Sequence, residues 1–250
     1  MAETQRYFIK LAFNGKAYHG WQRQENALTV QQVLEEGLAL IFGTKLALTG
    51  AGRTDTGVHA TKFYAHFDLS VRLTDDELGK KVLKLNSYLP GDIFVFEIRP
   101  VHPHAHARFD AISRTYEYII TTRKDPFRQD AAWYVYGELD VAKMNEAAKL
   151  LNDYTDFTSF SKLHTQVKTN NCRIMEAHWE EDGSLLVFRI KADRFLRNMV
   201  RAIVGTLIDI GRGRIDTGDF KRIIEARNRS EASLSVPAHG LYLINIEYPD

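Results

Sequence analysis

Residues 63–98, FYAHFDLSVRLTDDELGKKVLKLNSYLPGDIFVFEI, contain a complete strand–helix–strand pattern. Apolar and aromatic residues predominate over Phe63–Leu69 and over Ile93–Ile98, which predicts a strand in each place. Between them, Thr74-Asp75-Asp76-Glu77 has the form of a helix N-terminal capping box. The helix that follows is expected to place one apolar stripe against the sheet, formed by Leu78, Val82 and Leu85.

The residues before this stretch supply the other half of the same pattern. An alternating, aromatic-rich segment at Tyr7–Phe13 predicts a strand. Thr29-Val30-Gln31-Gln32 has the form of a second capping box, followed by a helix with one apolar stripe. A short strand is expected at Leu46–Thr49. The order β-α-β-β-α-β is that of the ferredoxin-like, split-βαβ fold.

The second half of the chain repeats this theme with insertions. Strands are expected at Arg114–Thr121, Trp133–Tyr136, Arg173–Trp179, Ser184–Lys191 and Leu241–Glu247. Helices are expected from Asp140 to about Asn152, from about Arg194 to Ile210, and from about Gly218 to Ala226. The sequence therefore predicts an α+β protein with two domains, residues 1–105 and 106–250. We expect two ferredoxin-like or RRM-like units that form an extended, mainly antiparallel sheet, with helices packed on one side and a central active-site cleft.

The composition is that of an ordinary soluble globular protein and excludes disorder or a fibrous repeat. The 250 residues are 44% hydrophobic and 26% charged, with a net charge of +1. The longest uncharged stretch, Ala232–Ile246, is too short to span a bilayer, and the N-terminus lacks the order of a signal peptide. The single cysteine, Cys172, fits a reducing compartment, so we expect a cytoplasmic protein. With so little net charge, a polyanion-binding face requires uneven placement of the charges.

The segment Gly50-Ala51-Gly52-Arg53-Thr54-Asp55-Thr56-Gly57-Val58-His59-Ala60 lies between two predicted strands. Its three glycines permit tight or left-handed backbone, and a loop held by strand ends is a natural place to present a carboxylate. The alternative is a turn in which Asp55 only bonds its own backbone. A phosphate-binding P-loop is excluded because the Gly-x4-Gly-Lys-Ser/Thr order is absent.

The predicted helix from Arg194 carries a stripe of arginines. At 100° per residue, Arg194, Arg197 and Arg201 fall within an arc of about 60°, opposite the apolar side. Such a stripe suits phosphates or a carboxylate partner; a solvated face of an amphipathic helix is the alternative. Ten basic and five acidic residues lie between Lys191 and Arg229, which favours an anionic ligand.

Two aromatic features have the same ambiguity. Arg114, Tyr116 and Tyr118 share one face of a predicted strand, where an arginine and tyrosines hold a phosphate and stack a base. Packing in the core is the alternative for these tyrosines, and also for Trp21.

A metal site is a weaker hypothesis. His102, His104 and His106 alternate as in a strand, but Pro103 interrupts them and no nearby cysteine or clear carboxylate completes a ligand set. A linker with incidental histidines is the simpler interpretation. Cys172 has no local signature of a catalytic thiol.

Taken together, these segments resemble the tRNA pseudouridine synthase A family, which modifies the anticodon stem-loop of tRNAs at tRNA positions 38–40. The resemblance covers nearly the whole chain in the correct order. It is carried by Tyr18-His19-Gly20-Trp21-Gln22-Arg23-Gln24, Thr29-Val30-Gln31, Gly52-Arg53-Thr54-Asp55-Thr56-Gly57-Val58-His59-Ala60, Leu89-Pro90-Gly91-Asp92-Ile93, His106-Ala107-Arg108-Phe109-Asp110-Ala111, Arg114-Thr115-Tyr116-Glu117-Tyr118, Asp156-Phe157-Thr158-Ser159-Phe160, Asn198-Met199-Val200-Arg201 and Pro237-Ala238-His239-Gly240-Leu241. The Gly-Arg-Thr-Asp-x-Gly-Val-His motif is the most specific of these.

The resemblance implies a role for four residues. Asp55 would be the catalytic aspartate and Tyr116 the tyrosine that packs on the target base. Arg53 would engage RNA from the same loop, and Arg201 would pair with the aspartate. The family also implies a homodimer acting on tRNA, with no cofactor and no metal.

Two other functions remain open at this point. A non-catalytic RNA-binding protein built from RRM-like units would keep the basic residues and the aromatics. It would have no use for an aspartate beside an arginine in a glycine loop, because a carboxylate facing phosphate weakens binding. A metal-dependent hydrolase that uses the histidines would lose its activity to a chelator.

Overall fold

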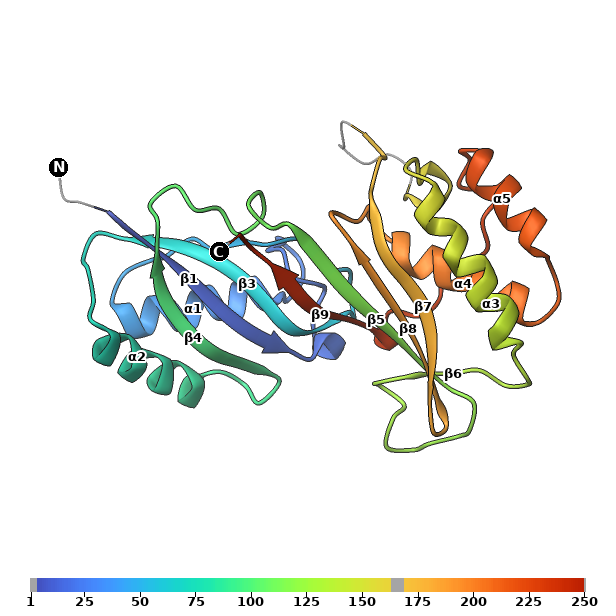
Figure 1. Ribbon diagram of the computed structural model, residues 1–250. Helices are drawn as coiled ribbons and strands as arrows, with labels where there is room; N and C mark the ends of the chain where they lie inside the picture. Colours follow the sequence, from blue (N-terminus) through green and yellow to red (C-terminus); the bar gives the residue numbers. More distant parts are fainter. Residues whose placement is uncertain (1–3, 163–168, 250) are drawn as a thin grey trace. The chain divides into compact units, whose positions relative to one another are not determined.

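The structure is a computed structural model that describes residues 4–162 and 169–249 (Figure 1). The chain forms two compact units. The first contains Met1–Ile112 and Leu243–Asp250, and the second contains Ser113–Tyr242. The chain therefore leaves the first unit once and returns to it at its end. These units are defined by contacts, whereas a domain also folds independently. The predicted domains, residues 1–105 and 106–250, therefore stay a prediction.

The first unit contains a sheet covered by two helices. Its strands follow the order β4-β1-β3-β9, and β1 is antiparallel to both β3 and β4. The strands are β1 (Gln5–Phe13), β2 (Thr49–Gly50), β3 (His59–Leu69), β4 (Ile93–Val101) and β9 (Leu241–Glu247), with β2 paired to β3. The helices are α1 (Val30–Phe42), α2 (Asp75–Tyr88) and the single-turn η1 (Gly15–Ala17).

Alternation along β1 creates the core of the first unit. Tyr7, Ile9, Leu11 and Phe13 are all buried. Both predicted helix starts are observed, but only one has the full capping box. At Thr74 both bonds with Glu77 are present; at Thr29 the side chain accepts from the Gln32 N–H, while the Gln32 side chain donates to Glu36 instead. The predicted strand at Leu46–Thr49 is wrong in extent, because pairing with β3 begins only at Thr49.

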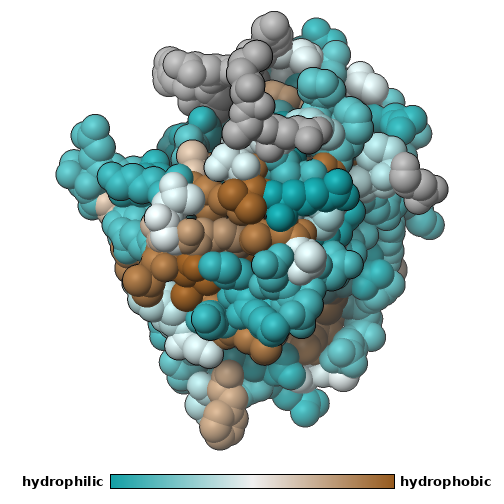
Figure 2. All heavy atoms as spheres, turned by 90° about the vertical axis from the view of Figure 1, so that its left-hand side faces the viewer, coloured by the Kyte–Doolittle hydropathy of each residue, from teal (hydrophilic) through white to brown (hydrophobic). Residues whose placement is uncertain are grey.

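The edge strand β4 exposes apolar side chains. Figure 2 shows apolar residues gathered on the side of the first unit that lies at the left of Figure 1. Phe94 and Phe96 are 51% and 47% exposed, and their rings meet edge-on with centroids 5.1 Å apart. Edge strands with exposed apolar residues are surfaces on which other chains can pair.

The second unit is an antiparallel sheet with helices on one face (Figure 1). Strand β8 lies between β5 and β7, and the short β6 pairs with β5 in parallel. Its strands are β5 (Ser113–Thr121), β6 (Trp133–Tyr134), β7 (Ile174–Asp182) and β8 (Leu185–Ala192). Its helices are α3 (Val141–Leu150), α4 (Met199–Gly211) and α5 (Thr217–Glu225), with the short turns η2 (Leu151–Asp153), η3 (Thr158–Phe160) and η4 (Ala238–Gly240).

The prediction of a helix from about Arg194 is wrong at its N-terminal end. Helix α4 begins at Met199, because Asn198 has the left-handed backbone angle φ +67°. A left-handed residue cannot continue a right-handed helix. Arg194 and Arg197 therefore precede the helix, and only Arg201 lies on it, so the three arginines do not form a helical stripe. The helix itself is almost entirely buried.

The α+β class and the mainly antiparallel sheet are confirmed. Among the described strands, β1 with β3 and β4, β2 with β3, and β8 with β5 and β7 are antiparallel, and β5 with β6 is parallel. In the part of the chain that the structure describes, no helix is long and apolar enough to cross a membrane.

Candidate active site

The loop with Asp55 begins and ends in the sheet of the first unit. Strand β2 pairs with β3 at Thr49 and Gly50, and the Ala51 N–H donates to the Tyr64 carbonyl at 2.8 Å. The chain then leaves the sheet and re-enters it at His59, the first residue of β3. We call residues 52–58 the Asp55 loop. Its short span between two paired strands limits how far the carboxylate can move.

A tight turn fixes the backbone of Asp55. The Val58 N–H donates to the Asp55 carbonyl at 3.2 Å, and Gly57, between them, has φ +80°. That angle is typical of the third position of a type II turn, which glycine occupies without strain. Within the loop, Arg53 is exposed and Asp55 is half-buried. The turn therefore presents the carboxylate from a defined backbone position.

A second segment, residues 15–21, packs directly behind the Asp55 loop; we call it the backing segment. Gly20 has φ +83°, and a Cβ there would lie 2.2 Å from the Thr54 carbonyl oxygen. A Cβ at Gly15 would lie 2.0 Å from the Val58 carbonyl oxygen. Only glycine permits two backbones to approach this closely. Both glycines are thus required for the loop to rest on the backing segment.

Hydrogen bonds link the two segments and fasten the backing segment to α1. The Gly57 N–H donates to the Tyr18 carbonyl at 3.3 Å. The N–H groups of Val30 and Gln31, in the first turn of α1, donate to the carbonyls of Gly20 and Trp21 at 3.3 and 3.0 Å. The free N–H groups of a helix start thereby find partners in the backing segment.

Trp21 belongs to the core of the first unit. Of the two interpretations that the sequence left open for this residue, packing in the core and stacking on a base, the first is therefore correct. It is 2% exposed, and its ring centroid lies 4.2 Å from that of Phe63. Tyr18 is equally buried, and its hydroxyl donates to Asp92 at 2.6 Å. Burial first, and then Asp92, raise the pKa of Tyr18, so its hydroxyl stays protonated. Neither ring is available to stack on a base.

The loop also contains a polar group without a bonding partner. Among the described residues, the hydroxyl of Thr54, next to Asp55, is buried and has no hydrogen-bond partner. An unpaired buried hydroxyl costs about 1–3 kcal/mol of stability.

Tyr116 lies in the second unit, in the middle of β5. It pairs with Ile190 of β8, is half-buried, and meets the ring of Phe195 edge-on with centroids 5.1 Å apart. Its neighbours on the same face have other tasks. Tyr118 is buried and donates to the Pro237 carbonyl at 2.8 Å, and Arg114 donates to the Asp193 carbonyl at 2.8 Å. The predicted phosphate-and-base face therefore reduces to Tyr116.

Arg201 lies in the first turn of α4 and is half-buried. Its Nε donates to the Val236 carbonyl at 2.7 Å, and the Val236 N–H donates back to the Arg201 carbonyl at 3.2 Å. This reciprocal pair fixes the direction of the guanidinium. Asp55 and Arg53 belong to the first unit and Tyr116 and Arg201 to the second, so both units carry candidate residues.

Several of the described histidines accept hydrogen bonds from backbone N–H groups and so stabilise the backbone around them. In the parts of the chain that are described, no group of three or more His, Cys, Asp or Glu residues is arranged to hold a metal ion. His106 Nδ1 accepts from the N–H groups of Arg108 and Phe109, and His66 Nδ1 accepts from that of Ala107. Burial lowers the pKa of His66 to about 4, and burial raises that of Cys172 to about 12. The metal-ligand hypothesis for His102, His104 and His106 thus finds no completing ligand set among the described residues.

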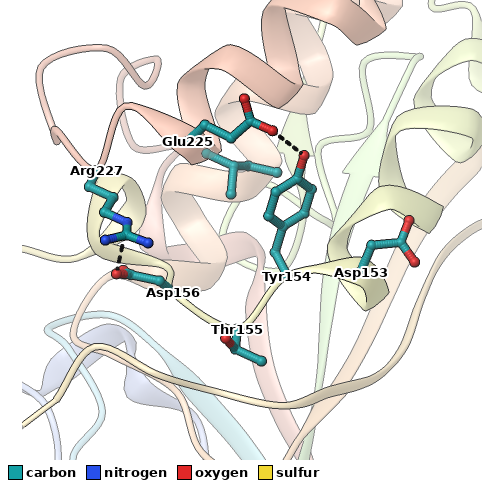
Figure 3. Close-up of a pocket in the computed structure, with 7 residues that line it drawn as sticks. Asp153, Tyr154, Thr155, Asp156, Glu225 and Arg227 are labelled. Carbon is teal, nitrogen blue, oxygen red and sulfur yellow. Dashed lines mark hydrogen bonds and ion pairs between the residues drawn. The ribbon is translucent and has the colours of Figure 1, made fainter.

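A hollow of about 280 Å³ in the second unit contains none of the candidate residues (Figure 3). Tyr154 donates to Glu225 at 2.8 Å, and Arg227 pairs with Asp156 at 3.2 Å. Four of its polar residues are therefore paired with one another.

Comparison with known proteins gives the chain a family. A family model described as tRNA pseudouridine synthase matches residues 147–249. The chain is 55% identical over 248 residues to the tRNA pseudouridine synthase A of Parabacteroides distasonis, covering 98% of this chain and 96% of that protein. It is 53% and 54% identical to the proteins of that name from Bacteroides fragilis and Porphyromonas gingivalis, each covering 98% of this chain and 97% of the relative.

The chain belongs to the tRNA pseudouridine synthase A family. Because these relatives match nearly the full length, the family assignment covers both compact units, including the Asp55 loop and β5. The sequence-based recognition of the tRNA pseudouridine synthase A family is thereby confirmed. The parts that the sequence did not predict are the glycine contacts of the backing segment, for which the only signal was glycine itself.

Proposed function

We propose that this chain converts uridine to pseudouridine in the anticodon stem-loop of tRNAs, at tRNA positions 38–40, with Asp55 as the catalytic carboxylate. The observation that carries the proposal is identity of 53–55% over nearly the whole chain to proteins named tRNA pseudouridine synthase A. The fixed turn that presents Asp55 supports the choice of residue.

The reaction explains why a carboxylate is wanted. The bond from N1 of uracil to C1′ of ribose breaks, the base turns, and C5 bonds to C1′; C5 then loses its proton and N1 gains one. No atoms are gained or lost overall and nothing is oxidised, so the balance requires no cofactor. An ionised carboxylate can capture or stabilise an electron-poor sugar, as in retaining glycosidases. Attack at C1′, attack at C6 and assistance in forming a glycal are three routes that each use an ionised carboxylate such as Asp55.

Three further residues are proposed to act with Asp55. Arg201 pairs with the carboxylate and favours its charged form, since a nearby cation stabilises an anion in a partly desolvated site. Its fixed guanidinium supports this role. Tyr116 packs on the target base, and its half-buried ring, braced by Phe195, supports that role.

Arg53 is proposed to engage RNA from the Asp55 loop, which its exposure supports. A uridine in a stem or loop must leave its stack to react, which costs a few kcal/mol. An aromatic platform such as Tyr116 offsets part of that cost.

We also propose that the protein acts in the cytoplasm as a homodimer. What supports a second copy is the exposed apolar edge of β4, with Phe94 and Phe96. Measurement of the molar mass in solution tests this part; a monomer at the concentration of the assay contradicts it.

The function is tested by incubating the purified protein with unmodified tRNA and mapping pseudouridine chemically at each site. We expect product at tRNA positions 38–40, with and without a chelator. Binding of tRNA without product would favour the RNA-binding alternative, and loss of activity in the chelator would favour a metal-dependent enzyme.

A further inference from the structure

The connection from β5 to α3 carries exposed aromatic and basic side chains, none of them among the residues proposed for catalysis. We call residues 122–137 the aromatic–basic loop (Figure 1). Phe127 is 94% exposed and Tyr136 is 83% exposed, and both exceed every large apolar residue of β4. Arg123 and Lys124, in the same loop, are also exposed, and among the described residues neither has an ion-pair partner.

The tip of the loop is ordered by Asp125. Its carboxylate accepts from the Phe127 N–H at 2.9 Å and pairs with Arg128 at 3.3 Å, while its carbonyl accepts from the Arg128 N–H at 3.2 Å. The N–H groups of Ala131 and Ala132 then donate to the Arg128 carbonyl. Phe127 is therefore held at the tip of a hydrogen-bonded turn, pointing away from any core.

The returning limb of the loop is fastened to the sheet. Ala132 and Val135 are buried, and the Val135 N–H donates to the Thr121 carbonyl at 3.0 Å. The Tyr242 hydroxyl donates to the Ala131 carbonyl at 2.8 Å. Tyr136, which follows, is left in solvent by this anchoring.

An ordered loop that exposes two aromatic rings gains nothing in folding from those rings, since burying one would contribute about 1.5–3 kcal/mol. The combination with unpaired cations indicates the kind of partner. The centres of protein–protein interfaces are enriched in aromatic residues and arginine but depleted of lysine, which this loop exposes. Single-stranded nucleic acid, in contrast, is bound by aromatic rings that stack on bases next to cations that contact phosphates.

We propose that the aromatic–basic loop is a second contact for the tRNA substrate, in which Phe127 and Tyr136 stack on unpaired bases and Arg123 and Lys124 contact phosphates. Arg128 and Asp125 keep the turn in shape. This proposal rests on the proposed function for the identity of the RNA, and it adds a binding surface outside the residues assigned to catalysis.

The test measures tRNA affinity and turnover of the full-length protein. Phe127→Ala is expected to weaken tRNA binding by about 5- to 150-fold, the range that corresponds to one lost base stack. The KM is expected to rise while kcat stays at the wild-type value, because the contact does not change between ground and transition states. Phe127→Trp keeps a stacking surface and is expected to bind as the wild type does.

A charge variant provides an independent arm. Replacing both Arg123 and Lys124 by Gln is expected to reduce the slope of log affinity on log salt by about 1 for each cation. The matched controls are Leu83→Ala and Lys84→Gln, an exposed apolar residue and an exposed cation on α2, which are expected to leave affinity and slope unchanged.

The outcomes separate this inference from the proposed function. Wild-type affinity and salt slope in both loop variants, with pseudouridine still formed, would overturn the second contact and leave the function standing. Loss of tRNA affinity in the loop variants of a protein that forms no pseudouridine would support the contact and overturn the function. Retained RNA affinity together with loss of a protein complex or of vesicle binding would assign the loop to another partner and overturn the inference.

Discussion

A methyl group added at Gly20 should disable catalysis by pushing on the Asp55 loop. In Gly20→Ala the new Cβ would lie 2.2 Å from the Thr54 carbonyl oxygen, while real Cβ atoms keep at least 3.0 Å. The Thr54 carbonyl must therefore retreat by about 0.8 Å, and the Asp55 carbonyl carbon would itself lie only 3.2 Å from the new Cβ. A displacement of about 1 Å in a catalytic group costs roughly 100-fold in rate.

Gly43 offers a matched control for backbone strain. It also has a positive φ, +71°, but a Cβ there meets nothing within 4 Å. Both substitutions place an L-residue in the left-handed region, which costs about 1–2 kcal/mol. Gly20→Ala adds overpacking of about 1–3 kcal/mol. We expect Gly43→Ala to be less stable than wild type but fully active, and Gly20→Ala to be less stable still.

The assay is steady-state pseudouridine formation over a range of tRNA concentrations, at a temperature where thermal unfolding shows both variants folded. We expect kcat of Gly20→Ala to fall by about 100-fold with KM close to wild type, since the loop moves without removing an RNA contact. Equal kcat values for Gly20→Ala and Gly43→Ala would refute the claim that the backing segment positions Asp55.

Tyr116→Phe is expected to keep KM, because the ring still stacks, and to lower kcat if its hydroxyl accepts the C5 proton; wild-type turnover would remove Tyr116 from that role. Arg201→Lys keeps the charge but lacks the Nε donor to Val236, so we expect a lower kcat at unchanged tRNA affinity, and an unchanged kcat would count against a positioned guanidinium. His66 titrates near pH 4 in the folded protein and near 6.5 unfolded. The unfolded chain therefore binds more protons between these values, and stability should fall by up to about 3 kcal/mol as pH drops from 6.5 to 4. In urea titrations His66→Asn, which retains an acceptor for the Ala107 N–H, should lose much of this slope, whereas an identical slope would assign the acid sensitivity elsewhere.

Helices and strands whose ends are determined by nearby residues could be predicted from the sequence. The capping box at Thr74 and the apolar run from Ile93 predict the starts of α2 and β4 where they are observed. The start of α4 could not be predicted, because apolar spacing runs through Asn198, whose left-handed conformation depends on tertiary contacts such as that of its amide with Ser235. Apolar periodicity alone contains no information about such a break.

The sequence identified the family but not what supports the candidate site. The Gly-Arg-Thr-Asp sequence led to the family that the comparison confirms, while the role of Asp55 stays a prediction. The contact of Gly20 with Thr54 joins segments far apart in the sequence, so neither local pattern reveals it. Likewise Trp21 and Tyr118 were ambiguous, because burial in the core and stacking on a base require the same residue type.

The most direct test of the account follows the proton that leaves C5. With tRNA tritiated at C5 of its uridines, tritium is released only when C5 has bonded to C1′. We predict release by the wild-type protein in step with pseudouridine formation, and none by Asp55→Asn, although this variant should fold and bind the same tRNA with wild-type affinity. Tritium release by Asp55→Asn at the wild-type rate would contradict the assignment of Asp55 as the catalytic carboxylate.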